Sequence, residues 1–571
     1  MIISKNRFIK LLAISLCLIC ISANVFAQSK TYNEEITVVA PYDPIIPDAF
    51  KISRNPVADD TLAKIPVMSY TIMPRVADVK LGIEPIAAVK LVAEPLSKLY
   101  RNYIRAGAGN YSSLYGELFI SSLRSKKNMV SLRLKHQSAA GTIKDFGPSD
   151  NSRDEAELNG TKYLSQHTLS GNAFYSHYGL HLYGFKPSDL SAPLSKDDIR
   201  QRYITTGAKI VLASDYKSDE RLNHTIGLAY YYMAGLYKNN EHNVNLSANL
   251  DKKYDLFRTA QKQTIGISLG LDFLSQKDSI RHIKSAIVGI NPFIKASVNE
   301  YSFMVGFKMN LSIDSVTNAY IYPMAEAKLE IIPNALRVYA GISGGLERTS
   351  LRGISSQNAF ISSVLPWNYV NEKFKAYGGF HSNISRSFNF NGSISSSTIE
   401  NNPFFVTDTS FNLLNSFSLL YDDITHVKIS GELEYVRFEK LRISLTGSYN
   451  HYKLTQQAYA WYKPTYEFGL SGRYNIQDKI IVSIKANVNG TVWALKPQMI
   501  RAYSDGGRPV YVLNPEKLKG WTDVSLGGEY RINKALSCWL NLNNLTNSTY
   551  YRWLNYPSYG LNVMAGLSYS F

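Results

Sequence analysis

The last eleven residues of the chain alternate between apolar and polar side chains. Successive side chains on a β-strand point to opposite faces, so this segment has one apolar face and one polar face. The pattern predicts the closing strand of a transmembrane β-barrel, with lipid on one side and a watery lumen on the other. The apolar face consists of Leu561, Val563, Ala565, Leu567, Tyr569 and the terminal Phe571.

The same alternation recurs along the chain, for example at Val130–Lys135, Val427–Tyr435, Leu441–Asn450 and Asp523–Ile532. One such segment would also fit a soluble β-sandwich. Many of them, with charged residues on the polar face, predict an all-β, transmembrane outer-membrane β-barrel over residues 99–571.

Short connections alternate with long ones from a first strand near Tyr100 onwards. Gln477-Asp478 is a typical short connection, and 348–371 is a typical long one. Together they give about 22 antiparallel strands, an even number that leaves both ends of the barrel on the periplasmic side. A barrel of that width is not filled by its own inward side chains, so function depends on what occupies the lumen.

The first 27 residues have the features of a secretory signal peptide. A basic stretch, Met1–Lys10, precedes the apolar run Leu11–Ser22, and Val25–Ala27 provides small residues for cleavage. After Ser22 no apolar run approaches the length of a membrane-spanning helix, so a membrane-embedded chain must cross as strands. We therefore expect a processed protein of the cell outer membrane.

Composition agrees with that environment. The chain has 40 tyrosines, and aromatic side chains form belts at the two interfaces of a membrane barrel. Cys538 is the single cysteine outside the signal peptide, which excludes an intramolecular disulfide, and it shares an apolar strand face with Leu540. The formal net charge is +17, and loss of the three basic residues of the signal peptide leaves +14. That excess predicts contact with anionic lipopolysaccharide or a lumen that favours anions, and solvated turns account for part of it. We expect no nucleic-acid partner, because nucleic acid lies in another compartment.

The sequence has no glycine-rich phosphate loop, no nucleophile elbow, no zinc-protease motif and no paired cysteines. His177 and His181 are four residues apart, which on a strand merely places them on one face. We therefore expect no enzymatic activity, no cofactor and no metal ion.

Two parts of the chain resemble a known family. Asn541–Leu545, Tyr550-Tyr551, Tyr556-Pro557 and Gly560–Phe571 resemble the end of a TonB-dependent receptor barrel. Near the mature N-terminus a six-residue run is similar to a TonB box, the strand that such receptors add to the sheet edge of TonB. The run consists of Glu35, Ile36, Thr37, Val38, Val39 and Ala40.

The resemblance implies a receptor whose plug is reduced or missing. Residues 28–98 form a short proline-rich segment, too short for the folded plug of the family, and they could act as a partial stopper or as a periplasmic tether. The implied partners are TonB or another periplasmic protein through residues 28–98, outer-membrane lipid with lipopolysaccharide, and the barrel-assembly machinery. The C-terminal signal for assembly would be Leu567, Tyr569 and Phe571.

Three functions remain open at this stage: solute uptake of the TonB-dependent type, passive diffusion through an open pore, and a scaffold within an envelope complex. All six tryptophans lie at or after Trp367, and several fall on or beside the long loops. Exposed indoles can stack on ligands, including sugars, but an aromatic belt at the membrane interface also explains them and is the favoured interpretation. The candidate extracellular contacts are Trp367, Trp461 and Trp553.

Overall fold

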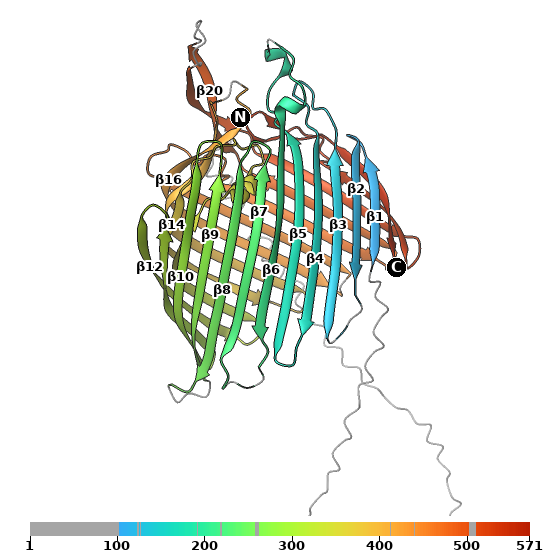
Figure 1. Ribbon diagram of the computed structural model, residues 1–571. Helices are drawn as coiled ribbons and strands as arrows, with labels where there is room; N and C mark the ends of the chain where they lie inside the picture. The colour runs from blue at the N-terminus through green and yellow to red at the C-terminus, as the bar shows by residue number, and fades with distance from the viewer. Residues whose placement is uncertain are drawn as a thin grey trace, which may run out of the picture. The chain divides into compact units, whose positions relative to one another are not determined.

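Figure 1 shows a computed structural model of the protein. The structure describes residues 102–571 except 123–124, 126, 191, 217, 219, 257–261, 411–412, 439 and 502–509. The described residues all fall in one compact unit, Ala93–Phe571. The predicted signal peptide (residues 1–27), the proline-rich segment with its boundary at residue 98, and the TonB-box-like run at residues 35–40 lie outside them.

The described residues are mostly strands, with one short α-helix, α2 (Leu351–Gln357), and two 3-10 turns, η1 (Pro187–Asp189) and η2 (Asp197–Ile199). The strands are β1 (Tyr103–Gly109), β2 (Ser113–Ser121), β3 (Asn128–Ala139), β4 (Asn151–Tyr163), β5 (His167–His181), β6 (Arg200–Ser214), β7 (Asn223–Gly235), β8 (Asn240–Tyr254), β9 (Gln263–Lys277), β10 (His282–Val298), β11 (Tyr301–Ile313), β12 (Thr317–Ile332), β13 (Leu336–Arg348), β14 (Tyr369–Asn383), β15 (Phe388–Thr407), β16 (Phe417–Arg437), β17 (Leu441–Leu454), β18 (Tyr466–Ile476), β19 (Ile480–Asn489), β20 (Val492–Arg501), β21 (Val510–Leu518), β22 (Trp521–Arg531), β23 (Leu536–Asn543), β24 (Tyr551–Trp553), β25 (Tyr556–Pro557) and β26 (Asn562–Ser570).

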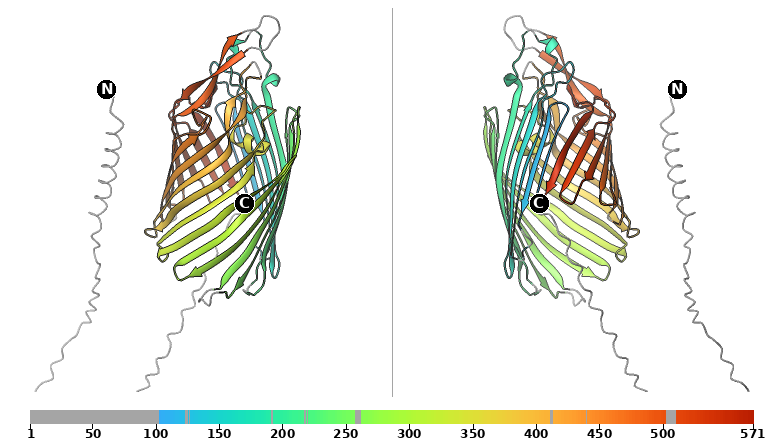
Figure 2. Two further views of the ribbon diagram at one scale, coloured as in Figure 1. Left: turned by 90° about the vertical axis from the view of Figure 1, so that its left-hand side faces the viewer. Right: turned by 90° about the vertical axis from the view of Figure 1, so that its right-hand side faces the viewer.

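Twenty-two of these strands form a single sheet. The sheet curves round into a barrel, as Figures 1 and 2 show. Neighbouring strands pair antiparallel, and the ring closes between β1 and β26, where Gly107 lies opposite Gly566. The predicted strand number and fold class are therefore confirmed. Two hairpins, β20–β21 and β24–β25, form small sheets of their own.

The two ends of the barrel differ in the length of their connections. At the short-turn end, Gln477 and Asp478 both have positive φ angles, 51° and 56°, as tight two-residue hairpins require. The other end, here called the long-loop end, carries the extended connections. They are 140–150, 182–199, 349–368, 408–416, 455–465, 490–520 and 544–561.

The outer face of the sheet is apolar, as the alternation predicts. On β26 the side chains of Leu567 and Tyr569 are about half exposed, whereas Met564 on the opposite face is buried. Cys538 lies opposite Leu567 on this outer face. Exposed aromatic residues gather near the short turns, where a membrane barrel carries an aromatic girdle. They include Tyr254, Tyr301, Phe303, Phe388, Tyr474, Tyr530, Tyr569 and Phe571.

Among the residues that the structure describes, none belongs to a helix long and apolar enough to cross a membrane.

The closing seam of the barrel is covered from inside by one indole. Trp539 on β23 is 4% exposed, and its ring lies over Gly107 and Gly566 of the two seam strands. A Cβ at Gly566 would collide with this ring and with the carbonyl oxygen of Ala106. The guanidinium of Arg105 sits 4.5 Å from the centre of the ring. A side chain at either Gly107 or Gly566 would therefore occupy the space that the indole fills.

We predict that Gly566→Val destabilises the barrel, because the added side chain must displace Trp539 or part β1 from β26. Overpacking of this kind costs about 2 kcal/mol or more. Thermal unfolding followed by circular dichroism should show a lower Tm. Gly270→Val is the matched control, because an added Cβ at Gly270 on β9 meets no atom within 4 Å. Equal Tm values for the two variants would contradict the seam model.

Candidate functional site

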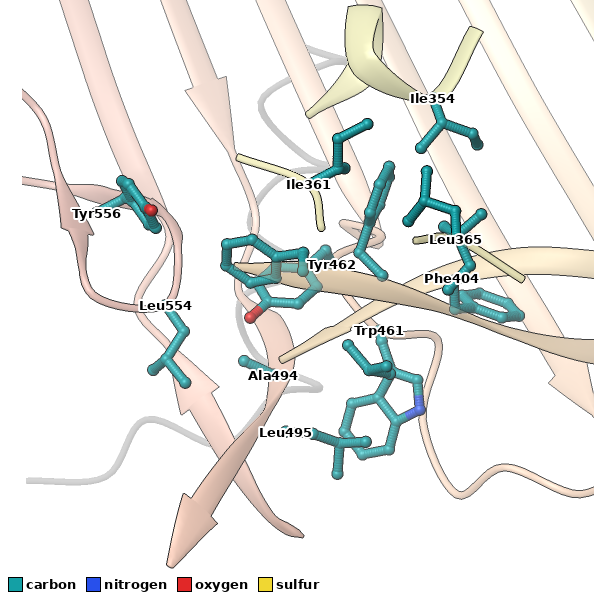
Figure 3. Close-up of a cluster of buried hydrophobic side chains, with 14 of the residues drawn as sticks. Ile354, Ile361, Leu365, Phe404, Trp461, Tyr462, Ala494, Leu495, Leu554 and Tyr556 are labelled. Atoms are coloured by element: carbon teal, nitrogen blue, oxygen red, sulfur yellow. The ribbon is translucent and has the colours of Figure 1, made fainter. Parts of the chain in front are cut away.

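The long loops turn inward and bury an apolar cluster with the upper ends of several strands. We call this cluster the loop cap, and Figure 3 shows part of it. Burial of apolar area drives such packing in loops that would otherwise be solvated. Its buried members are Leu180, Tyr203, Met233, Leu351, Ile354, Ile361, Leu365, Phe404, Phe405, Val406, Phe417, Leu419, Ile424, Trp461, Tyr462, Ala494, Leu495, Leu518, Leu554 and Tyr556.

Polar contacts carry the loop cap across the mouth of the barrel. Asn415 Nδ2, in the loop between β15 and β16, donates to the carbonyl oxygen of Leu182, 2.7 Å away in the loop between β5 and β6. These loops are ten strands apart around a ring of 22, so they rise from opposite walls. The Tyr203 hydroxyl on β6 makes a further bond of 3.0 Å to the carbonyl oxygen of Ala359. The cap therefore bridges the lumen at its long-loop end.

Tyr556 joins four of the loops. Its ring stacks on Phe360 with centroids 3.7 Å apart and meets Tyr183 edge-on at 4.9 Å. Its hydroxyl donates to the carbonyl oxygen of Asn415. The side chain is 3% exposed, and burial raises the pKa of its hydroxyl well above the usual value. Tyr556 is therefore an uncharged core residue that packs against loops 182–199, 349–368 and 408–416 from its own loop, 544–561.

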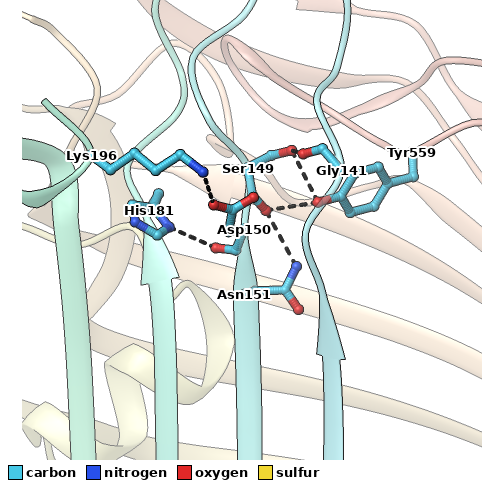
Figure 4. Close-up of polar contacts among 7 residues, drawn as sticks. All are labelled: Gly141, Ser149, Asp150, Asn151, His181, Lys196 and Tyr559. Carbon is cyan, nitrogen blue, oxygen red and sulfur yellow. Dashed lines mark hydrogen bonds and ion pairs between the residues drawn. The ribbon is translucent and has the colours of Figure 1, made fainter. Parts of the chain in front are cut away.

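A polar network ties the outer rim of the barrel to the same loops (Figure 4). The Tyr559 hydroxyl donates to the carbonyl oxygen of Ser149 at 2.7 Å. Next in the chain, Asp150 pairs with Lys196 Nζ at 2.6 Å, and its carbonyl oxygen lies 2.8 Å from His181 Nδ1. Loops 140–150, 182–199 and 544–561 thus hold one another in place.

Helix α2 is anchored by a carboxylate from the barrel wall. Glu241 on β8 is fully buried and accepts hydrogen bonds from the backbone amides of Leu351 and Arg352 at the start of the helix. The Tyr231 hydroxyl donates to the same carboxylate at 2.7 Å. A negative group at a helix N-terminus satisfies free amides and complements the helix dipole. This contact fixes where Arg352 enters the lumen.

Beneath the loop cap lies a cavity of about 740 Å³, which we call the cap cavity. The volume falls in the range typical of small-molecule sites. The inner wall contributes Arg133, Arg153, Glu155, Glu157, Phe174, Ser176, Tyr178 and Thr205, and the loops contribute Arg352, Ser355, Gln357, Phe360, Arg552, Trp553 and Tyr556. Wall and loops therefore share one site.

The arginines of the cap cavity differ in their partners. Arg133 Nε lies 2.8 Å from Glu117 Oε1, and Arg153 Nε lies 2.8 Å from Glu155 Oε1. Arg352 and Arg552 have no carboxylate partner among the described residues; Arg352 rests on two aromatic rings and Arg552 on one. Contacts of this kind are cation–π interactions.

The ring contacts of the two unpaired guanidinium groups are well defined. Arg352 lies 4.6 Å from the ring centre of Tyr231 and 4.9 Å from that of Phe174. Arg552 lies 5.2 Å from the ring centre of Trp521. Arg552 also lines a second lumenal cavity of about 690 Å³, whose wall is mostly uncharged and polar, with Ser393 and Ser430 hydroxyls 2.8 Å apart. Arg552 therefore stands between the two cavities.

No group of three or more potential metal ligands occurs within the described part of the chain. His177 and His181 lie on β5 with different partners: His177 Nδ1 is 3.1 Å from Asp154 Oδ2, and His181 bonds to the backbone of Asp150.

The three predicted tryptophan contacts occupy different places. Trp553 lines the cap cavity, with its ring edge-on to Phe405 at 5.0 Å. Trp461 is 2% exposed in the loop cap, and its indole nitrogen donates to Gln457 Oε1 at 3.1 Å. Trp367 packs on Tyr369 in a separate small cluster. Ligand contact by these residues stays a prediction, and Trp553 is the one of the three that lines the cap cavity.

The sequence reasoning missed Arg352, Arg552 and Glu241. Segment 348–371 is predicted as a long connection, and within it Ser350 caps helix α2 by accepting a hydrogen bond from the amide of Gly353. A serine directly before the apolar residues Leu351 and Ile354, which are spaced as on one face of a helix, is a helix-start signal present in the sequence. Arg552 carries no signal of its own, because its position depends on how loop 544–561 folds.

No protein-family model matches the sequence, and no curated protein matches it. Solved structures do match the fold. The ferric-catecholate import receptor Fiu from E. coli K12 superposes with a TM-score of 0.58 at 12% identity, covering 82% of each chain.

Two further matches are of the same kind. The pyoverdine outer membrane receptor FpvA from Pseudomonas aeruginosa PAO1 gives a TM-score of 0.60 at 11% identity, covering 83% of this chain and 78% of its own. The siderophore receptor PirA from Acinetobacter baumannii gives 0.60 at 10% identity, covering 82% and 80%. The fold is therefore that of outer-membrane receptor barrels, which confirms at the level of fold the resemblance to TonB-dependent receptors.

We predict that Tyr556→Ala loosens the loop cap while the barrel stays folded. Truncating a buried aromatic residue costs about 3–5 kcal/mol, so amides in loops 349–368 and 408–416 should lose hydrogen-exchange protection by at least tenfold. Tyr551→Ala in the same loop is the matched control, because Tyr551 is exposed. Unchanged protection in Tyr556→Ala would show that Tyr556 does not hold the loops together.

Proposed function

We propose that this chain is an outer-membrane solute receptor of the TonB-dependent type, which binds its ligand in the cap cavity and passes it into the lumen. One observation carries the proposal. The cap cavity is bounded on one side by the inner wall and on the other by loops of the long-loop end. A ligand held there touches both the entrance and the conduit, so its binding can be coupled to movement of the loops.

The matched structures support this role. Their names describe an import receptor, an outer membrane receptor bound to pyoverdine and a siderophore receptor. They also favour a role in transport rather than in enzymatic catalysis. By analogy, this chain would bind a small organic solute from outside the cell and lack catalytic residues.

The loop cap argues against passive diffusion through an open pore. An apolar core and a hydrogen bond between loops from opposite sides span the mouth, so we infer that both must be broken before solutes can pass. A diffusion channel would gain nothing from such a closure. Uptake therefore needs an event that opens the cap.

The partner proposals follow the same model. TonB would pair with residues 35–40 by strand addition, and Leu567, Tyr569 and Phe571 would direct the C-terminal strand to the barrel-assembly machinery. Outer-membrane lipid surrounds the apolar face of the barrel, and lipopolysaccharide would meet basic rim residues such as Lys196, which is largely exposed.

A scaffold role is a second candidate, favoured by the hairpin β20–β21. Its two strands form a sheet of their own. One face carries Pro497, Met499, Leu513 and Pro515, with Met499 53% exposed. The base of the hairpin packs in the loop cap through Leu495 and Leu518, and an exposed apolar face on the rest of the hairpin is the kind of surface that binds a partner. Stoichiometric co-purification of a surface protein that is lost when residues 496–516 are deleted would favour this role.

We predict that the mature protein does not conduct ions in a planar bilayer. A variant lacking residues 28–98 should also stay closed, because the loop cap alone bridges the mouth. Adding Tyr556→Ala to that deletion should produce open channels. Tyr551→Ala in the same background should stay closed and serves as the control. Steady conductance by the unmodified mature protein would instead identify a passive pore.

We also predict that the purified mature protein binds the periplasmic domain of TonB from the same organism. Deleting residues 35–40 should abolish the complex, since strand addition needs that run. Deleting residues 60–65, an equally long piece of the same segment, should leave it intact. Complex formation that survives the first deletion would overturn the TonB-box assignment.

A further inference from the structure

The cap cavity carries more positive charge than its own wall neutralises. Its lining contains four arginines and two glutamates, Glu155 and Glu157. Glu155 is taken by Arg153, and Glu157 accepts a hydrogen bond of 3.0 Å from Asn172 Nδ2. Arginine stays charged in proteins, and no carboxylate among the described residues forms an ion pair with the guanidinium group of Arg352 or of Arg552, so these two of the four cationic groups in the lining are available to a ligand.

The Arg352 side chain is held with its hydrogen-bonding edge free. The Glu241 carboxylate fixes the backbone amide of Arg352, and the rings of Tyr231 and Phe174 support its guanidinium from the wall. None of the N–H donors of its guanidinium has a protein acceptor among the described residues. A guanidinium presents its donors in a planar fork that matches a carboxylate or a phosphate in a bidentate fashion.

Aromatic side chains line the same cavity as the two unpaired charges. They include Tyr178, Phe360 and Trp553. Rings of this kind bind a flat, apolar body by stacking. An inorganic anion would use the arginines and leave these surfaces wet, whereas a neutral aromatic solute would leave both charges unused.

We propose that the cap cavity selects solutes that join an anionic group to an aromatic or flat apolar body, with Arg352 and Arg552 binding the anionic group. This inference rests on the proposed receptor function and names its ligand class. Arg352 and Arg552 contact the solute directly, and Glu241 acts through Arg352 as a positioning residue.

The test compares two probes of the same shape and different charge, 4-nitrobenzoate and 4-nitrobenzamide. Binding of each to the purified full-length mature protein is measured by equilibrium dialysis against a detergent blank. We expect the anion to bind at least fivefold more tightly than the amide. Arg352→Gln and Arg552→Gln should each reduce anion binding by about tenfold, the size expected for a lost hydrogen bond to a charged group, and leave amide binding unchanged.

Arg437→Gln is the matched control. Its guanidinium also rests on a ring, that of Phe438 at 5.8 Å, but at the short-turn end of β16. This variant should bind both probes like the native protein. Glu241→Gln should weaken anion binding and leave amide binding unchanged, which a general loss of fold would not do.

Equal binding of the two probes, no binding of the anion above the blank, or a preference that survives both arginine variants would each overturn the proposal. Dialysis measures binding without transport. If the protein prefers the anion but the unmodified mature form conducts ions steadily in the bilayer, the proposed function alone is contradicted. If it stays closed until the loop cap is loosened but shows no preference for the anion, this inference alone is contradicted.

Discussion

Lipid offers no hydrogen bonds, and the rest of the structure follows from that constraint. Every backbone amide and carbonyl inside the bilayer must be paired within the protein, and a sheet achieves this only when it closes. Closure between β1 and β26 removes the last free edge. The number of strands then sets the width of the lumen, and a ring of 22 leaves a space that wall side chains cannot fill. Material from the loops occupies part of that space.

The long loops contain apolar residues that pack together across the wide lumen. A loop on the surface of a soluble protein is usually polar, because its backbone is solvated. Here Phe404 and Phe417, both nearly inaccessible, lie where β15 and β16 lead into loop 408–416. Loops from several parts of the ring pool their apolar residues and form one core above the lumen. The protein thus has a membrane-facing apolar surface and, separately, an apolar interior made by loops.

The strands of the barrel wall can be predicted from the sequence, whereas the contacts of the loop cap cannot. Strands follow a local pattern of period two, and short turns such as Gln477-Asp478 interrupt that pattern, so the strands, the short turns and the strand number can be predicted from the sequence. The contacts of the cap join distant residues, as in the bond from the Tyr183 hydroxyl to the carbonyl oxygen of Pro557, 374 positions away. No period links such residues. Glu241 illustrates the same difficulty, because in sequence it is one more polar residue of an alternating strand, and its role appears once α2 is placed above it.

The bonds across the mouth have a mechanical meaning as well. A single-layer ring of strands is a thin hoop, which is stiff along its strands and easily flattened across its diameter. The link between Asn415 and Leu182 joins loops from opposite sides of that hoop and acts as a crossbar. Flattening the barrel across the perpendicular diameter moves these two loops apart and must stretch or break the link, and releasing the link must make that deformation easier. The shape of the wall within the membrane and the closure of the mouth are therefore one coupled property.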